Sequence, residues 1–476
     1  METACYNAVV RRPVEVIAIG CLISIAPVHA VRADNVDFHA TANGSVATTD
    51  NVNGAETGSP GRKADVFSDV RPGFLVTYNA PRMVHEITSE VDFLYHLASA
   101  KPSVTFRAGW KSFFIPSPRT EQTFDAEASL GQLNNLDASA SPLGDPLQVR
   151  PLGRTDTRNV GGSENGSWVA SEASRIWQRG VARYTTTEDN QQAVETSSFE
   201  VGGGIGFDRN LRYNTFVFEL GASYLRLERL DPNMVQMGNR LDRQFNPRGV
   251  FVWQHDINQK WSTNVDAGVV YVNPLWADPY NPSDDRKGAF FPIFGVLGAY
   301  TDVWGRATAT ARRQVTPNLY IAQNTVSDSF NITAAMPLTI FDKDARRRDP
   351  RVVGIGTIGI ERTQLIDPTS GTLEGDFTAA RIDVGVGWSP RPGQTVGLRY
   401  EFQYQNGDSI GEMIVPSFFR NTFYFTFSLR WPEELQVRVP RRNNSVRADR
   451  KDLSPVGAEP VIVDPTEFLN GGGGDR

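Results

Sequence analysis

Long segments of alternating apolar and polar residues are the feature that most constrains this chain. Residues 103–114 alternate except at Ser112 and Phe113, and residues 395–405 alternate throughout. In the second segment, one face would carry only large apolar side chains, namely Val396, Leu398, Tyr400, Phe402 and Tyr404. A period of two places successive side chains on opposite faces of a β-strand. Such segments are longer than the five or six residues typical of soluble strands and match the roughly 9–11 residues of a tilted membrane strand.

Composition is compatible with strands that cross a membrane. The chain has 476 residues, of which 40% are hydrophobic, and its mean hydropathy is −0.34. It contains no run of 18 apolar residues, so no transmembrane helix is predicted. In a membrane barrel only every second residue faces lipid, and the average hydropathy therefore stays low. A net charge of −6 argues against a general nucleic-acid binder.

The first 33 residues have the pattern of an export signal. Arg11 and Arg12 precede an apolar stretch at 16–26 that is too short to span a bilayer, and small-residue cleavage sites end at Ala30 and Ala33. We expect residues 1–33 to be removed. Cleavage would remove both cysteines of the chain, Cys5 and Cys21, and with them any disulfide or cysteine metal site.

The remaining chain divides by composition into three parts. Residues 34–68 are polar and lack apolar periodicity, which predicts a disordered linker, and residues 432–476 predict a disordered tail with a basic stretch. Residues 69–431 predict a closed antiparallel all-β barrel of about 16 strands, with 14 or 18 left open. Segment 166–185 is taken as one strand and 132–165 as a long connection. Counting back from the C-terminus places that connection at the same end as the tight turns, which indicates a missed strand before residue 166.

The most specific motif is the last alternating segment, residues 421–432, with the sequence NTFYFTFSLRWP. It resembles the terminal-strand signal that the outer-membrane assembly machinery reads, with five alternate apolar positions: Phe423, Phe425, Phe427, Leu429 and Trp431. The usual signal ends the chain, whereas here 45 residues follow. The resemblance implies a Gram-negative outer-membrane β-barrel of the porin-like class, without a single family. It also implies contact with outer-membrane lipids, lipopolysaccharide and the assembly machinery. The linker and tail would then be periplasmic, and the tail could contact periplasmic proteins or the cell wall.

Charges of both signs occupy the polar faces of the predicted strands. We take eight of them as pore-lining: Arg107, Lys111, Asp125, Glu127, Arg381, Asp383, Arg399 and Glu401. Opposed charges across a lumen favour hydrated polar solutes, and we therefore expect a passive diffusion channel for small hydrophilic solutes. Two alternatives stay open. The charges could neutralise one another in a plugged barrel, or the barrel could be an outer-membrane conduit or scaffold of an export machine, for example for polysaccharide.

Motifs for catalysis or for cofactors are not evident. After cleavage the chain keeps four histidines, His39, His85, His96 and His255. His255 and Asp256 are adjacent, so on a strand their side chains point to opposite faces. No phosphate-binding glycine loop, zinc-ligand spacing or EF-hand pattern is present. We expect no enzyme activity, no cofactor and no metal.

Overall fold

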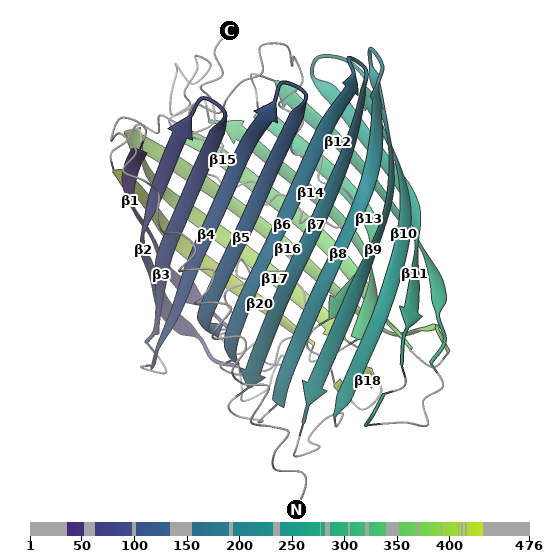
Figure 1. Cartoon of the computed structure of the whole chain (residues 1–476). Coiled ribbons are helices and arrows are strands. Elements are labelled where there is room, and N and C mark those ends of the chain that lie inside the picture. The colour runs from purple at the N-terminus through teal and green to yellow at the C-terminus, as the bar shows by residue number, and fades with distance from the viewer. Residues whose placement is uncertain are drawn as a thin grey trace, which may run out of the picture.

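The computed structural model shows one continuous antiparallel sheet of 18 strands (Figure 1). It describes residues 36–51, 62–97, 101–133, 155–189, 194–231, 239–276, 278–280, 286–302, 305–318, 323–338, 352–367, 370–391, 393–407, 409–410, 413–414 and 417–431. The strands are β1 (Val36–Thr49), β2 (Asp65–Ala80), β3 (Met83–His96), β4 (Lys101–Ser117), β5 (Thr120–Leu133), β6 (Thr155–Ser171), β7 (Ser174–Asp189), β8 (Val194–Asn210), β9 (Asn214–Leu230), β10 (Arg240–Asp256), β11 (Trp261–Pro274), β12 (Ala289–Asp302), β13 (Gly305–Asn318), β14 (Gln323–Pro337), β15 (Val352–Ile366), β16 (Leu373–Arg391), β17 (Gln394–Gly407) and β20 (Phe418–Trp431). A separate two-stranded pair consists of β18 (Ser409–Ile410) and β19 (Met413–Ile414).

The sheet closes on itself because the last strand pairs with the first. β20 pairs with β17 on one side and with β1 on the other, from Ala40 opposite Trp431 to Thr49 opposite Thr422. The fold is therefore a closed antiparallel transmembrane β-barrel, as the alternation predicts. Closure removes the open sheet edge that hydrocarbon cannot satisfy. Within the described ranges, no helix reaches the length and apolar content needed to cross a membrane.

The strand number is 18 and not about 16, and the first additional strand is β1. Residues 34–68 were predicted as a disordered linker, but residues 36–49 and 65–68 belong to β1 and β2. The outward positions of β1 include small residues such as Ala42 and Gly44, so its apolar alternation is weak. A neighbouring aromatic ring covers part of this face instead. Phe427 lies over Gly44, where a Cβ atom would come within 2.5 Å of the ring.

The second additional strand comes from the segment 166–185, which is a hairpin and not one strand. β6 and β7 pair from Thr155–Asp189 to Ser171–Ser174 around the turn at 172–173. That turn, Glu172-Ala173, has neither glycine nor proline, and β6 is rich in Gly, Ser and Asn, so sequence patterning missed both. With the extra strand, the connection between β5 and β6 lies at the end opposite the tight turns. The count of 16 strands had placed this long connection at the same end as the tight turns.

Apart from residues 338–351 between β14 and β15, the connections at one end of the barrel are shorter than most of those at the other end. The β2–β3, β4–β5 and β6–β7 turns consist of residues 81–82, 118–119 and 172–173, and these tight turns lie at the upper end in Figure 1. β1 starts and β20 ends at this same end, because each is antiparallel to its neighbours. The opposite end carries longer connections, including 134–154, 231–239 and 275–288. The predicted signal peptide and C-terminal tail lie outside the described residues.

A polar clamp holds the first and last strands together at the end with the long connections. Asp50 accepts hydrogen bonds from the backbone and side-chain amides of Asn421, both at 2.8 Å, and from Arg62 at 2.7 Å. The guanidinium of Arg62 also lies 4.0 Å from the centre of the Phe419 ring. Burial raises the pKa of Asp50, but the hydrogen bonds from Asn421 and Arg62 outweigh it and hold this pKa below its usual value.

One part of the wall departs from a simple cylinder. At the end with the long connections, the tips of β13 and β14 (residues 314–318 and 323–327, here called the flap) fold to the inner side of the barrel. Val315 packs against a cluster formed by Val250 and Val252 of β10 and Ile293 of β12. Asn324 of β14 donates a hydrogen bond to Gln244 of β10, which lies four strands away. Along the wall that separation is about 19 Å, so Asn324 reaches β10 only from inside.

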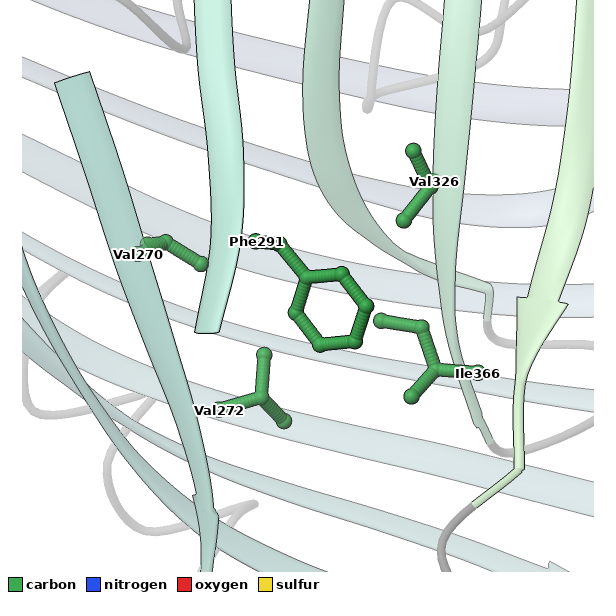
Figure 2. Close-up of a cluster of buried hydrophobic side chains, with 5 residues drawn as sticks. All are labelled: Val270, Val272, Phe291, Val326 and Ile366. Atoms are coloured by element: carbon green, nitrogen blue, oxygen red, sulfur yellow. The ribbon is translucent and has the colours of Figure 1, made fainter. Parts of the chain in front are cut away.

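The flap covers an apolar cluster that Figure 2 shows in close-up. Val270 and Val272 of β11 and Phe291 of β12 lie on one side, and Val326 of β14 and Ile366 of β15 lie on the other. A β-bulge between Thr363 and Leu365 interrupts the β15–β16 register at the same level. Bulges bend the strand that carries them, which is consistent with the inward course of this part of the wall.

Candidate functional site: the inner face of the barrel

The strands present an apolar face outward and a polar face inward. On β16, Ile382, Val384 and Val386 are exposed, whereas the side chains of Arg381 and Asp383 between them are only 15% and 17% exposed. In a closed barrel, the exposed face is the outer surface and the shielded face surrounds the lumen. The same alternation on the other strands makes the lumen surface the candidate functional site.

Aromatic pairs mark both edges of the outer apolar band. The rings of Trp261 and Tyr300 are 4.8 Å apart near one end, and those of Tyr271 and Phe290 are 4.4 Å apart near the other. Ten residues of β11 separate Trp261 from Tyr271. At about 3.3 Å per residue and a tilt near 45°, they span about 23 Å, close to the roughly 25 Å apolar band of outer-membrane barrels.

The densest charge cluster lies on β16 and β17. Glu401 accepts hydrogen bonds from Arg381 and Arg399, each at 2.9 Å. Asp383 contacts the Nε atom of Arg399 at 2.7 Å, and its distance to Arg381 is 3.5 Å. Glu401 is nearly buried, whereas Arg399 stays 36% exposed. Two cations and two anions on adjacent strands therefore form one network, with the Arg399 guanidinium as its most accessible member.

The other four predicted residues lie on the inner faces of β4 and β5. Arg107 contacts Asp92 at 3.2 Å and Glu90 at 3.5 Å. Lys111 lies 3.8 Å from Asp125, and both are largely exposed. Glu127 is 3.4 Å from Arg183 of β7. The structure thus divides the eight predicted residues between two groups, one on β16–β17 and one on β4–β5.

Some charged residues of the inner face were not among the predicted eight. Arg179 of β7 and Arg248 of β10 both bind Glu219 of β9, the latter at 3.1 Å. Arg71 of β2 bridges Asp69 at 2.6 Å and Asp92 at 3.3 Å. Arg179 was missed because the β6–β7 hairpin was taken as one strand. Its alternation with Arg175, Trp177 and Arg183 is the signal that could have identified it.

The terminal strand keeps the alternation that the sequence indicates. Its five apolar residues are exposed on the outer face, at 57% for Phe423, 46% for Phe425, 39% for Phe427, 42% for Leu429 and 67% for Trp431. Thr422, which directly precedes them, is buried and bonds to Thr49 of β1. β20 is thus the strand that closes the barrel, and its five apolar side chains face outward.

Histidines and carboxylates of the described residues form no evident reactive centre. His96 contacts Asp65 at 2.9 Å, and His255 contacts Asn214 at 3.0 Å. Within the described part of the chain, no group of three or more His, Cys, Asp and Glu side chains could hold a metal ion. In the connection after β11, the Asp278 carboxylate is buried against Arg286 at 3.0 Å.

Comparison with known proteins gives no family. No family model matches the chain, and no curated protein matches it. Among solved structures, Pseudomonas aeruginosa OccK2 (OpdF) in complex with glucuronate has 8% identity and a TM-score of 0.43, covering 83% of this chain and 98% of that chain. P. aeruginosa OpdK with vanillate has 9% identity and a TM-score of 0.43, covering 83% and 99%. The FrpB iron transporter from Neisseria meningitidis has 9% identity and a TM-score of 0.46, covering 84% and 82%.

Proposed function

We propose that this protein is an outer-membrane channel through which small hydrophilic solutes diffuse passively. The observation that carries the proposal is the closed 18-stranded barrel with an apolar outer face and a charged inner face. Barrels of 16 to 18 strands are wide enough to leave an aqueous channel, whereas eight-stranded barrels are filled by their own side chains. The charged inner face is the surface that water and polar solutes would contact.

The membrane location follows from the outer face. Exposed large apolar side chains occur around the barrel, including Phe218 at 57%, Ile358 at 54% and Phe425 at 46%. Contiguous exposed apolar surface of this kind marks a surface that contacts lipid or another apolar partner. The apolar band, of about 23 Å between aromatic pairs, fits the hydrocarbon core of an outer membrane. We place the tight-turn end in the periplasm, with the long connections outside the cell.

The terminal strand supports assembly in the same membrane. Its outward Phe425 and Phe427 stand in the middle of the predicted recognition motif, and β20 closes the barrel against β1. We propose that the assembly machinery reads this strand after the signal peptide is removed. Lipid and lipopolysaccharide would then surround the outer face.

The inner charges support selectivity among small polar solutes. The β4–β5 and β16–β17 groups both retain accessible charge, at Lys111 and Arg399 respectively. Because these charges line the path of a solute, they stabilise hydrated ions and polar groups over apolar molecules of the same size. Their mutual pairing keeps the net field small, which suits a general diffusion channel.

Solute uptake by proteoliposomes tests the proposal. Liposomes that contain the purified protein should swell in isotonic solutions of small sugars, with rates that fall as the sugar becomes larger. Liposomes without protein, and liposomes with heat-denatured protein, are the controls. Swelling no faster than in the controls, with protein shown to be folded and inserted, would contradict the channel.

Deletion of residues 433–476 separates the channel from an export conduit. A diffusion channel should keep its swelling rate without the tail, since β20 ends at Trp431. If transport of sugars persists while the cells lose secretion of a surface polymer, the conduit is the better account.

A further inference from the structure

The wall of the barrel has an incomplete hydrogen-bonded ladder between β12 and β13. Their pairing runs from Asp302 opposite Gly305 to Phe294 opposite Arg313 and ends there. β12 continues as residues 289–293, which pair only with β11 among the described strands. β13 continues into the flap, which pairs with β14 on the inner side. The two strands therefore separate at this end of the barrel.

The separation begins within the apolar band. Phe290 belongs to the aromatic pair at the edge of that band, and Phe294, in the last ladder pair, lies four residues further in. At about 3.3 Å per residue and a tilt near 45°, the separation extends about 9 Å below the edge of the band. An incomplete ladder at this depth faces the outer leaflet of the membrane.

The lipid-facing side of the separation is apolar and suited to a strand edge. Phe290 is 71% exposed and Phe294 is 47% exposed, the former being the highest value among the exposed large hydrophobic residues. Pro292 stands between them and has no backbone N–H to donate. Proline within sheets is confined to edges, first residues and bulges, and β12 is such an edge at this level.

The flap closes the inner side of the separation by side-chain packing. Val315 and Val326 of the flap, together with Ile366 of β15, pack in clusters with inner residues of β10, β11 and β12. Figure 2 shows Val326 and Ile366 directly across from Phe291. At its tip, the Asn324 amide donates a hydrogen bond to Gln244 of β10. Side-chain contacts take the place of backbone ladder bonds here. The flap can therefore separate from the wall without disrupting the rest of the sheet.

The surface under the flap is apolar and adjoins charged pairs. Val250, Val252, Val270 and Ile293 are buried on the inner face there. Two residues before Val250, Arg248 pairs with Glu219 at 3.1 Å. Such a surface matches a molecule with one acyl chain and one charged head group, because the chain would contact the valines and the head group would contact the charged pairs.

We propose that the flap is a gate over a lateral window, through which a single-chain amphipathic molecule passes between the outer leaflet and the lumen. The proposal rests on the proposed function in that it requires a membrane-inserted barrel with an accessible lumen. Movement of Val315 and Val326 away from the inner face of β10–β12, further into the lumen, opens the window. The Asn324–Gln244 contact at the tip holds it closed.

The test uses a fluorescent label under the flap and a reversible lock on its tip. The full mature chain carries Val252→Cys labelled with bimane, together with Asn324→His and Gln244→His, which would bind Zn²⁺ between the flap and β10. The only native cysteines, Cys5 and Cys21, precede the barrel and are removed or changed to serine. The probe is doxyl-stearate, a single acyl chain with a carboxylate head and a nitroxide quencher, in phospholipid vesicles.

Doxyl-stearate should quench the label at position 252 without zinc, lose that quenching when zinc is added, and recover it when a chelator removes the zinc. A label at Ser163→Cys, on β6 where the ladders to β5 and β7 are complete, should be unquenched in all three conditions. A variant with the two valines Val315 and Val326 changed to alanine, without the histidine pair, should show stronger quenching at position 252, since the flap would be held less firmly.

Equal quenching with and without bound zinc, or quenching by a water-soluble nitroxide but not by doxyl-stearate, would overturn the lateral gate. Calorimetry establishes that zinc has bound, and a protein without the two histidines controls for other zinc sites. Single-channel conductance of the same labelled proteins tests the proposed function separately. Conductance without doxyl-stearate quenching leaves a channel and removes the gate, whereas quenching without conductance leaves the gate and removes the diffusion channel.

Discussion

Reversal of one inner charge, Arg399→Glu, should shift the ion selectivity of the channel toward cations. Arg399 is the most accessible member of the β16–β17 cluster, with 36% of its side chain exposed. The change removes one positive charge and adds one negative charge beside Asp383 and Glu401. Because the exchange leaves the outer face and the ladder unchanged, we expect the barrel to fold.

The size of the shift follows from Coulomb's law. One unit charge about 7 Å from an ion in water contributes about 0.6 kcal/mol, and 0.1 M salt roughly halves it. Two units of change therefore stabilise a cation by about 0.6 kcal/mol and destabilise an anion by about as much. The ratio of cation to anion permeability should rise about sevenfold, since about 1.4 kcal/mol corresponds to tenfold. Arg399→Gln changes one unit and should give about threefold.

The assay is the reversal potential of a planar bilayer that separates two KCl concentrations. Arg119→Glu, in the turn between β4 and β5, is the matched control, with the same change of charge outside the ladder. Heat modifiability in gel electrophoresis verifies that each variant is folded. An unchanged reversal potential for a folded Arg399→Glu channel, or an equal shift for Arg119→Glu, would refute the placement of Arg399 on the conducting path.

Three further variants test the outer face and the seam between β1 and β20. Phe425→Arg should destabilise the inserted barrel by about 2–4 kcal/mol in urea titrations, whereas inward-facing Thr426→Arg should cost much less; equal costs would contradict the assignment of faces. Gly44→Val should lower the unfolding temperature because its side chain would overlap the Phe427 ring, and Gly44→Val together with Phe427→Ala should recover part of the loss if that overlap is the cause. Asp50→Asn should cost about 1 kcal/mol at neutral pH, since Asp50 is partly exposed. Because the pKa of Asp50 is lowered in the folded protein, its contribution to stability is present above the usual carboxyl pKa and is lost as the pH falls through the lower folded value. The free energies of unfolding of the native protein and of Asp50→Asn should therefore converge at acidic pH. A difference independent of pH would exclude the carboxylate as its source.

The fold could be predicted from sequence because hydrocarbon enforces a strict alternation. Strands such as β17 and β20 place large apolar residues at five successive outward positions, and both were identified. β1 and β6 were not, because their outward positions include Ala and Gly, and in β1 the Phe427 ring covers Gly44. Such strands derive their outer surface from residues distant in sequence, which no local pattern contains.

The arrangement of the inner charges could likewise be predicted only in part. The alternation identified Arg399 and Glu401 as neighbours on one face, but their contacts with Arg381 and Asp383 depend on the register between β16 and β17. The flap could not be predicted at all. Its inward course depends on contacts between residues distant in sequence, such as the hydrogen bond from Asn324 of β14 to Gln244 of β10.

The most direct test of the channel is single-channel recording of the purified mature protein in a planar bilayer. The account predicts stable steps of current that are proportional to voltage and increase with salt concentration, as an open aqueous lumen requires. Absence of such steps from a folded, heat-modifiable and inserted barrel would contradict it and would show that the lumen is closed to ions.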